Sequence, residues 1–174
     1  MSMNIKFGEY IIREWTPSDE AALVKYADNR LVWVNLDDIF PHPYTAADAR
    51  AWIVTASARP VTNFAIATDE EAIGGIGLKL QKDIYRRTAD VGYWLGEPYW
   101  GKGIATAALA AIVDFGFGEL DLVRLQANVF EYNPRSARVL EKNGFRLEGR
   151  LVKNITKDGK VIDSLLYALT RDDM

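Results

Sequence analysis

The chain has 174 residues, of which 49% are hydrophobic and 26% charged, a balance that fits a single domain spanning residues 1–174. It contains no cysteine and one histidine, His42, which excludes disulfides, thiolate zinc sites, a cysteine nucleophile and a multi-histidine centre, so we expect no metal. The formal net charge of -3 disfavours a dedicated nucleic-acid binder.

The N-terminal stretch MSMNIKFGEYIIREW lacks the apolar segment of a signal peptide, because charged residues interrupt its short apolar runs. The most apolar stretch, residues 104–117, contains Asp114 and is too short to span a bilayer. We therefore expect a cytoplasmic protein that does not enter a membrane.

Periodicity and turn residues predict the elements in chain order. The first part is predicted to form a strand at 5–13, a helix at 16–26, a short apolar segment at 31–36, a loop at 40–44 and a helix at 45–58. Strands at 63–68, 73–80 and 88–95, a helix from 104, a strand at 122–130, a helix at 133–143 and a hairpin of strands at 145–152 and 161–170 follow. This order predicts a mixed α/β sheet with helices packed on it.

Residues 96–106, GEPYWGKGIAT, lie between a predicted strand and a predicted helix. Gly96, Gly101 and Lys102 match the front of the phosphate-loop signature G-x-x-x-x-G-K-[ST], but Gly103 stands where a hydroxyl would bind Mg²⁺. Helix N-termini attract anions, and glycines let the backbone approach a phosphate. The stretch therefore favours either a tight strand-to-helix turn or a phosphate cradle of backbone amides without a metal.

Residues 133–145, NPRSARVLEKNGF, are typical of a helix with Asn133 as N-cap and Gly144 as its stop, and a purely structural role explains them equally well. Together with YWGKGIATAAL earlier in the chain, however, this segment resembles the GNAT superfamily of acetyl-CoA-dependent N-acetyltransferases. Within it, the chain is similar to the RimJ and RimL branch, the ribosomal-protein alanine and serine N-terminal acetyltransferases. The fragments GEYIIREWTPSDEAAL and DSLLYALTRDDM also look like that branch.

The resemblance implies one N-acetyltransferase domain with a mostly antiparallel central sheet, two splayed strands and helices on both faces. It implies acetyl-CoA as cosubstrate, bound through its pyrophosphate by Gly101, Lys102, Gly103, Ile104, Ala105 and Thr106. It also implies pantetheine contacts from Trp94, Leu95, Asn133 and Ser136, and an acceptor pocket walled by Phe40, His42 and Tyr44. A homodimer remains open.

Direct attack of an amine on the thioester is the simplest chemistry for a chain without cysteine. Many family members carry a tyrosine that acts as general acid at the position where this chain has Leu140. Ser136 therefore becomes the candidate that stabilises or protonates the leaving thiolate. Glu131 is the first candidate base, with Asp90 and His42 as alternatives. An α-amino group, with a pKa of about 7.7–8.0, needs less help than a lysine amine at about 10.4, which slightly favours α-amino acceptors.

Three functions remain to be weighed. The first is acetyl transfer to a primary amine, either a protein N-terminus or a small amine such as a polyamine, amino acid or antibiotic. The second is a non-catalytic coenzyme A-binding module on the same fold. The third, a phosphate-loop kinase or NTPase, is weakened by Gly103.

Overall fold

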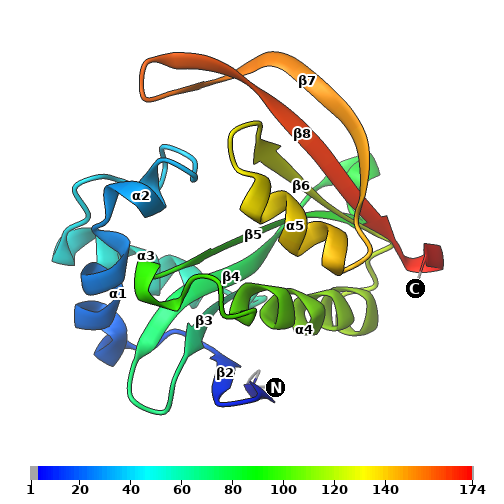
Figure 1. Cartoon of the computed structure of the whole chain (residues 1–174). Coiled ribbons are helices and arrows are strands. Elements are labelled where there is room, and N and C mark those ends of the chain that lie inside the picture. The colour runs from blue at the N-terminus through cyan, green and yellow to red at the C-terminus, as the bar shows by residue number, and fades with distance from the viewer. Residues whose placement is uncertain (1–3, 174) are drawn as a thin grey trace. The chain divides into compact units, whose positions relative to one another are not determined.

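The computed structural model describes residues 4–173 (Figure 1). Residues 1–3 and 174 belong to the terminal fragments quoted above and lie outside the described part. The strands are β1 (Asn4–Phe7), β2 (Tyr10–Arg13), β3 (Asn63–Ala67), β4 (Ala72–Leu80), β5 (Thr88–Leu95), β6 (Arg124–Phe130), β7 (Arg146–Lys157) and β8 (Lys160–Thr170). The α-helices are α1 (Glu20–Ala27), α2 (Arg30–Trp33), α3 (Ala46–Ala56), α4 (Ile104–Glu119) and α5 (Pro134–Lys142). The short 3-10 helices are η1 (Pro17–Asp19), η2 (Asp83–Tyr85), η3 (Glu97–Tyr99) and η4 (Arg171–Asp173).

The chain forms two compact units. The first comprises residues 1–77 and 93–108, and the second comprises residues 78–92 and 109–174. The hairpin of β4 and β5 and the helix α4 run through both units. The single domain expected from the sequence stays a prediction. Across residues 4–173, no helix has the length and apolar character that crossing a membrane requires.

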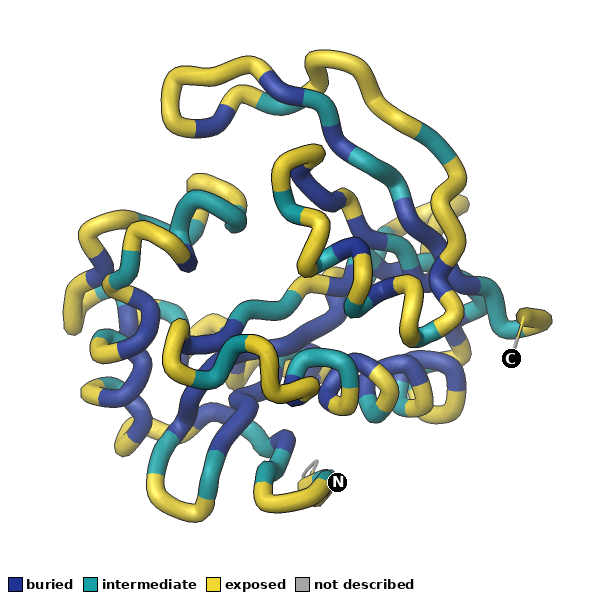
Figure 2. Tube along the Cα trace, in the orientation of Figure 1, coloured by how far each residue is buried: buried dark blue, intermediate teal, exposed yellow. Residues whose placement is uncertain are grey.

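The first unit begins with an antiparallel ladder of β1, β2, β3 and β4. The prediction of one strand at 5–13 is wrong, because the chain reverses at Gly8 and pairs Phe7 with Tyr10. Gly8 has a φ of 59°, a conformation that costs glycine little and other residues much more. Strands β3 and β4 are buried over almost their whole length, which the dark blue tube of Figure 2 shows.

Helices α1 and α3 of the first unit pack together over one apolar cluster. Helix α3 begins at a capping box, in which Asp48 accepts hydrogen bonds from the backbone N–H and the hydroxyl of Thr45 at 2.8 and 2.6 Å. The fully or nearly buried members of the cluster are Trp15, Ala22, Leu23, Ala27, Tyr44, Ala49, Ile53, Ala56, Ala65 and Ala72. The many alanines let the helix backbones approach the sheet closely.

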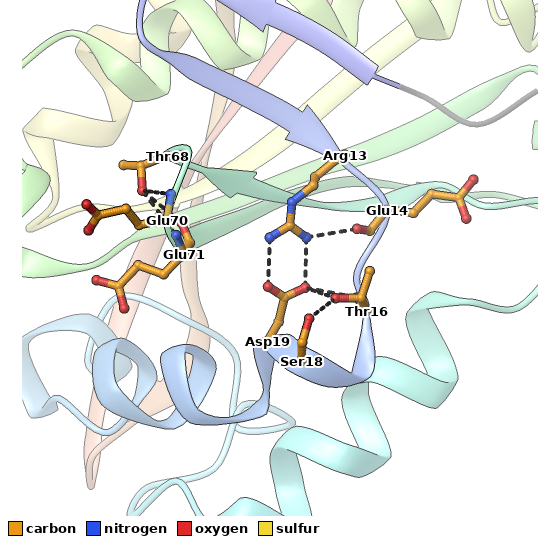
Figure 3. Close-up of polar contacts among 8 residues, drawn as sticks. All are labelled: Arg13, Glu14, Thr16, Ser18, Asp19, Thr68, Glu70 and Glu71. Atoms are coloured by element: carbon orange, nitrogen blue, oxygen red, sulfur yellow. Dashed lines mark hydrogen bonds and ion pairs between the residues drawn. The ribbon is translucent and has the colours of Figure 1, made fainter.

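A buried ion pair fastens the start of α1 to the end of β2 (Figure 3). Nη1 and Nη2 of Arg13 donate to the carboxylate of Asp19, at 2.8 and 2.7 Å, and the Thr16 N–H donates to it at 2.9 Å. The Asp19 side chain is 4% exposed. Burial alone would raise the pKa of Asp19, but the hydrogen bonds from Arg13 and Thr16 outweigh it and hold the pKa below its usual value.

The second unit pairs β5 in parallel with β6, which in turn pairs with β8, and β8 with β7. The registered pairs of β5 and β6 run only from Thr88 opposite Arg124 to Asp90 opposite Gln126, although both strands continue. Helix α5 packs beside β8, where the Tyr167 hydroxyl donates to Glu141 at 3.1 Å. The splayed strands that the sequence resemblance implies stay a prediction.

The hydrogen-bonded strand order is β1-β2-β3-β4-β5-β6-β8-β7, with the β5–β6 pair parallel. The predicted mixed α/β fold with mostly antiparallel strands is therefore confirmed. The chain also forms the predicted helices, including α5, which ends before Gly144 with a φ of 80°. The apolar segment predicted at 31–36 contributes to the short helix α2.

Replacing Asp19 with asparagine should lower the free energy of unfolding at pH 7 by about 1.5–3 kcal/mol, because it removes hydrogen bonds to a charged group. Since the folded pKa of Asp19 is depressed, this contribution is complete above about pH 5 and is lost progressively as the pH falls from the unfolded pKa of about 3.9 through the lower folded pKa. Urea unfolding of both proteins between pH 7 and pH 3 measures the difference. Asp69→Asn, at an exposed turn of the same unit, is the control, and equal stabilities of Asp19→Asn and wild type at pH 7 would contradict the prediction.

Candidate functional site

The chain leaves β5 at Leu95 and reaches α4 through a turn that is closed by its own hydrogen bonds. The Tyr99 N–H donates to the Gly96 carbonyl at 3.0 Å, and the Trp100 N–H donates to the Glu97 carbonyl at 3.1 Å. The Trp100 indole N–H donates to the Leu95 carbonyl at 2.8 Å. Hydrogen bonds within the chain thus hold the turn without a ligand.

The turn continues into a glycine loop, residues 101–106, at the N-terminus of α4. Gly101 and Gly103 have φ values of 75° and 76°, and a Cβ added at either position would meet no heavy atom within 4 Å. The positive φ therefore favours glycine at both positions, and the space where each side chain would start is open. The α4 ladder opens with the Ala107 N–H donating to the Gly103 carbonyl at 3.1 Å, so the amides of 102–106 lie at the positive end of the helix.

These features suit the loop to a phosphate group held by backbone amides. Lys102 is exposed and adds a positive charge, with its Nζ 5.2 Å from the centre of the Tyr99 ring. Trp94 and Leu95 precede the loop in the same unit. The first unit thus gathers the predicted pyrophosphate residues and the two predicted β5 residues in one continuous segment.

The loop between α2 and α3 carries the residues predicted to wall the acceptor pocket. The ring of Phe40 lies 4.9 Å from the Tyr44 ring and 5.5 Å from the Trp94 ring, centre to centre. Tyr44 is only 4% exposed, and burial raises its pKa to about 12, so it belongs to the core. Phe40 is half-buried and connects that core to Trp94 of β5.

His42 lies on the outer side of this loop. Its Nδ1 is 3.5 Å from a carboxylate oxygen of Asp28, and its ring centre is 5.7 Å from that of Trp33. The His42 side chain is 27% exposed. The three residues predicted for the acceptor pocket therefore differ in environment: Tyr44 is buried, Phe40 is half-buried, and His42 reaches the surface.

In the second unit, Asn133 and Ser136 share the first turn of α5. The Asn133 side-chain oxygen accepts a hydrogen bond from the Ser136 N–H at 3.2 Å, which is the expected N-cap. Ser136 is half-buried, and one turn further Leu140 is fully buried in the core. Leu140 is therefore a packing residue, and Ser136 carries the only hydroxyl on α5.

Glu131, predicted as a general base, has structural partners on both carboxylate oxygens. One oxygen accepts from Arg150 Nη2 at 2.6 Å, and the other accepts from the Asp163 N–H at 3.1 Å. Arg150 also donates to the Asp163 carboxylate at 2.5 Å. These contacts join the end of β6 to β7 and β8 and favour a structural role of Glu131.

Asp90, an alternative base, is also held on both oxygens. Gln126 Nε2 donates to one oxygen at 2.9 Å and Gln81 Nε2 to the other at 3.1 Å. Sequence reasoning missed these glutamines and Arg150, because nothing in the local pattern indicates contacts between distant strands. Among residues 4–173, no three His, Asp or Glu side chains are grouped as a metal ion would require.

Residues 10–146 match the sequence profile of the acetyltransferase (GNAT) domain. This match spans well over half of the chain, and the chain belongs to the GNAT acetyltransferase family. The resemblance to this family that the glycine loop and the Asn133 segment indicated is thereby confirmed.

Named relatives support the RimJ and RimL branch. The probable N-acetyltransferase YjcK of Bacillus subtilis is 39% identical over 62% of this chain and 59% of its own length. The ribosomal-protein-serine acetyltransferase of Escherichia coli is 34% identical over 60% of this chain and 58% of its own length. The spermidine N(1)-acetyltransferase of the same organism is 31% identical over 56% and 52%. The matches thus span less than two thirds of these relatives.

A solved structure, Mycobacterium smegmatis RimJ in complex with CoA-disulfide, matches over a longer range. It is 28% identical, with a TM-score of 0.84 over 99% of this chain and 88% of that one. The fold of the chain is therefore that of a GNAT acetyltransferase.

Replacing Glu131 with glutamine should leave the pH profile of kcat/KM for acetyl transfer unchanged. It should lower the free energy of unfolding by about 0.5–1.5 kcal/mol, because the Glu131 carboxylate accepts hydrogen bonds that connect strands. Urea unfolding and a pH–rate profile measure the two effects. Asp90→Asn is the matched comparison for the second carboxylate. A 100-fold or larger fall in kcat/KM with loss of one ionisation would instead identify Glu131 as the base.

Proposed function

We propose that the protein is an acetyl-CoA-dependent N-acetyltransferase that transfers acetyl directly to a primary amine, the α-amino group of a peptide or protein. The observation that carries this proposal is the glycine loop at the start of α4. It combines two glycines at positive φ, amides at a helix N-terminus and the exposed Lys102. The family assignment and the complex of Mycobacterium smegmatis RimJ with CoA-disulfide support coenzyme A as the phosphate-bearing ligand of this loop.

The residues present fit coenzyme A. A pyrophosphate needs several N–H donors and no side chain between them and the backbone, and the loop has open space at both glycines. Gly101, Lys102, Gly103, Ile104, Ala105 and Thr106 are proposed to hold it. Trp94, Leu95, Asn133 and Ser136 are proposed to contact the pantetheine arm. Gly103 also disfavours Mg²⁺-dependent nucleotide chemistry, because it offers no hydroxyl ligand.

Acetyl-CoA supplies an activated thioester, and three tasks fall to the chain. A backbone N–H near Trp94 or Leu95 polarises the acetyl carbonyl as in an oxyanion hole. The acceptor amine, once neutral, forms the new C–N bond while the C–S bond breaks, and its proton leaves to a base or to water. Ser136 donates a hydrogen bond to the departing thiolate, which needs modest help because a thiol has a pKa of about 8.5.

The acceptor is proposed to be an α-amino group, in line with the ribosomal-protein-serine acetyltransferase among the relatives. A small amine is the second candidate, and the relative that acts on spermidine favours it. Release of free thiol across a panel of peptides, polyamines and amino acids separates the two. Binding of coenzyme A, with no release of free thiol from acetyl-CoA in the presence of any acceptor, would favour a non-catalytic binding module. A cytoplasmic location and a homodimer remain predictions.

Acetyl-CoA should raise the melting temperature of the wild type, and Gly103→Glu should abolish this shift. The glutamate places a negative charge where the pyrophosphate is expected; its Cβ meets open space, and the strain of a side chain at this positive φ is a separate effect that the control variant measures. Gly103→Asn is the control, since asparagine tolerates a positive φ and adds no charge. Differential scanning fluorimetry measures the shifts, and no shift in the wild type would remove the proposed function.

Ser136→Ala should lower kcat about 10–100-fold with little change in the KM for acetyl-CoA. The variant lacks the proposed hydrogen bond to the coenzyme A sulfur, which becomes negatively charged as the C–S bond breaks. The N-cap of α5 should survive, since Asn133 accepts from the Ser136 backbone N–H. Steady-state kinetics with both substrates varied give the two constants. An unchanged kcat would remove Ser136 from the chemistry.

A further inference from the structure

Helix α1 supports the turn that precedes the glycine loop. Gly96 opens this turn, and a Cβ on Gly96 would lie 2.5 Å from Cδ1 of Tyr26. The ring of Tyr26 therefore packs directly against the Gly96 backbone, and the residue is only 8% exposed. The Gly96 N–H donates to the Ile73 carbonyl of β4 at 2.8 Å, so the turn is held between a strand and a ring of α1.

The Tyr26 hydroxyl is tied to a carboxylate on the turn between β3 and β4. It donates to Glu71 Oε1 at 2.6 Å, and Lys25 Nζ donates to the same oxygen at 2.8 Å. Burial, followed by the bond to Glu71, raises the pKa of Tyr26 to about 12. Hydrogen bonds from Lys25 and then Tyr26 lower the pKa of Glu71. At neutral pH the hydroxyl is thus a donor to a charged acceptor, the stronger class of hydrogen bond.

Glu71 is itself fixed in place. Its backbone N–H and that of Glu70 both donate to the Thr68 hydroxyl at 3.2 Å, as Figure 3 shows. The Thr68 N–H donates back to the Glu71 carbonyl at 2.9 Å. The carboxylate that holds Tyr26 therefore stands on a rigid turn.

The contacts continue from Tyr26 into the loop. The Tyr99 ring meets the Tyr26 ring edge-on, at 5.6 Å and 75°, and their hydroxyl oxygens are 3.5 Å apart. Lys102 Nζ lies over the Tyr99 ring at 5.2 Å. A second contact, from Asn29 Nδ2 to Glu97 Oε2 at 2.8 Å, ties the N-cap of α2 to the same turn. All of these residues belong to the first unit.

We propose that Tyr26, held by Glu71, is a positioning residue for coenzyme A binding, because its hydroxyl bond fixes the 96–99 turn and hence the amides of the glycine loop. The inference rests on the proposed function, since it assigns coenzyme A to that loop. Tyr26 acts through the turn and touches no reacting atom. Its loss should therefore weaken cofactor binding and spare the chemical step.

Tyr26→Phe is the variant of choice, because it keeps the ring against Gly96 and deletes only the hydroxyl. The Kd for coenzyme A and the KM for acetyl-CoA should rise about tenfold, the loss expected for one hydrogen bond. The kcat at saturating acetyl-CoA and the KM for the acceptor should stay within about twofold of wild type. Calorimetric titration with coenzyme A and steady-state kinetics give these values.

Two further variants test whether the hydroxyl acts through Glu71. Glu71→Ala should weaken coenzyme A binding as much as Tyr26→Phe, and the double variant should be no weaker than either. Glu71→Gln, which keeps a neutral acceptor, should recover part of the affinity and provides the same test if Tyr26→Phe does not fold. Arg50→Met is the matched control: it removes an exposed ion pair with Glu20 outside this network and should leave the Kd within about twofold.

Hydrogen exchange of the free protein tests the positioning without any ligand. The amides of residues 96–103 should exchange faster in Tyr26→Phe, while those of the β1–β2 hairpin keep the wild-type rate. Unchanged exchange, an unchanged Kd in Tyr26→Phe, or an equal loss in Arg50→Met would overturn the inference. A wild type that does not bind coenzyme A would instead overturn the proposed function, so the two failures are distinguishable.

Discussion

The absence of side chains at two successive positions of β4 allows β5 to lie where it does. A Cβ on Gly74 would lie 2.3 Å from the Trp94 carbonyl oxygen and 3.0 Å from the Leu95 Cα, and a backbone cannot yield as a side chain can. A Cβ on Gly75 would lie 2.8 Å from the Trp94 indole nitrogen and 3.2 Å from the Trp15 ring. This close approach places the strand that leads into the glycine loop, and the loop depends on it.

The glycines of the first unit therefore serve two distinct physical purposes. Gly74 and Gly96 give room, to the β5 backbone and to the Tyr26 ring respectively. Gly101 and Gly103 supply positive φ in open space, where a side chain would meet nothing. Gly74 and Gly96 allow close packing next to the loop, and Gly101 and Gly103 allow the backbone conformation of the loop itself. Together they let the loop present its amides to a ligand.

The separation along the chain between interacting residues explains which features could be predicted from the sequence. The loop and the N-cap of α5 depend on neighbours within a few residues, so GEPYWGKGIAT and Asn133 indicated them directly. The bond from Tyr26 to Glu71 joins residues 45 apart, and no local pattern announces it. The single strand expected at 5–13 failed for a local reason instead: alternation continued across Gly8, and the positive φ there, which makes the reversal, was not anticipated. The roles of the predicted site residues remain proposals.

The contacts of the candidate bases also bear on which amine the site suits. Glu131 and Asp90 each accept hydrogen bonds on both carboxylate oxygens, which occupies part of their accepting capacity and ties each carboxylate to neighbouring residues. An acetyl-transfer site without a dedicated base would depend on amines that become neutral without help. An α-amino group at about 7.7–8.0 is roughly 300-fold richer in neutral amine at pH 7 than a lysine side chain at about 10.4. The structural use of these carboxylates therefore strengthens the argument for an α-amino acceptor over a lysine side chain, because it leaves the cost of deprotonation with the acceptor.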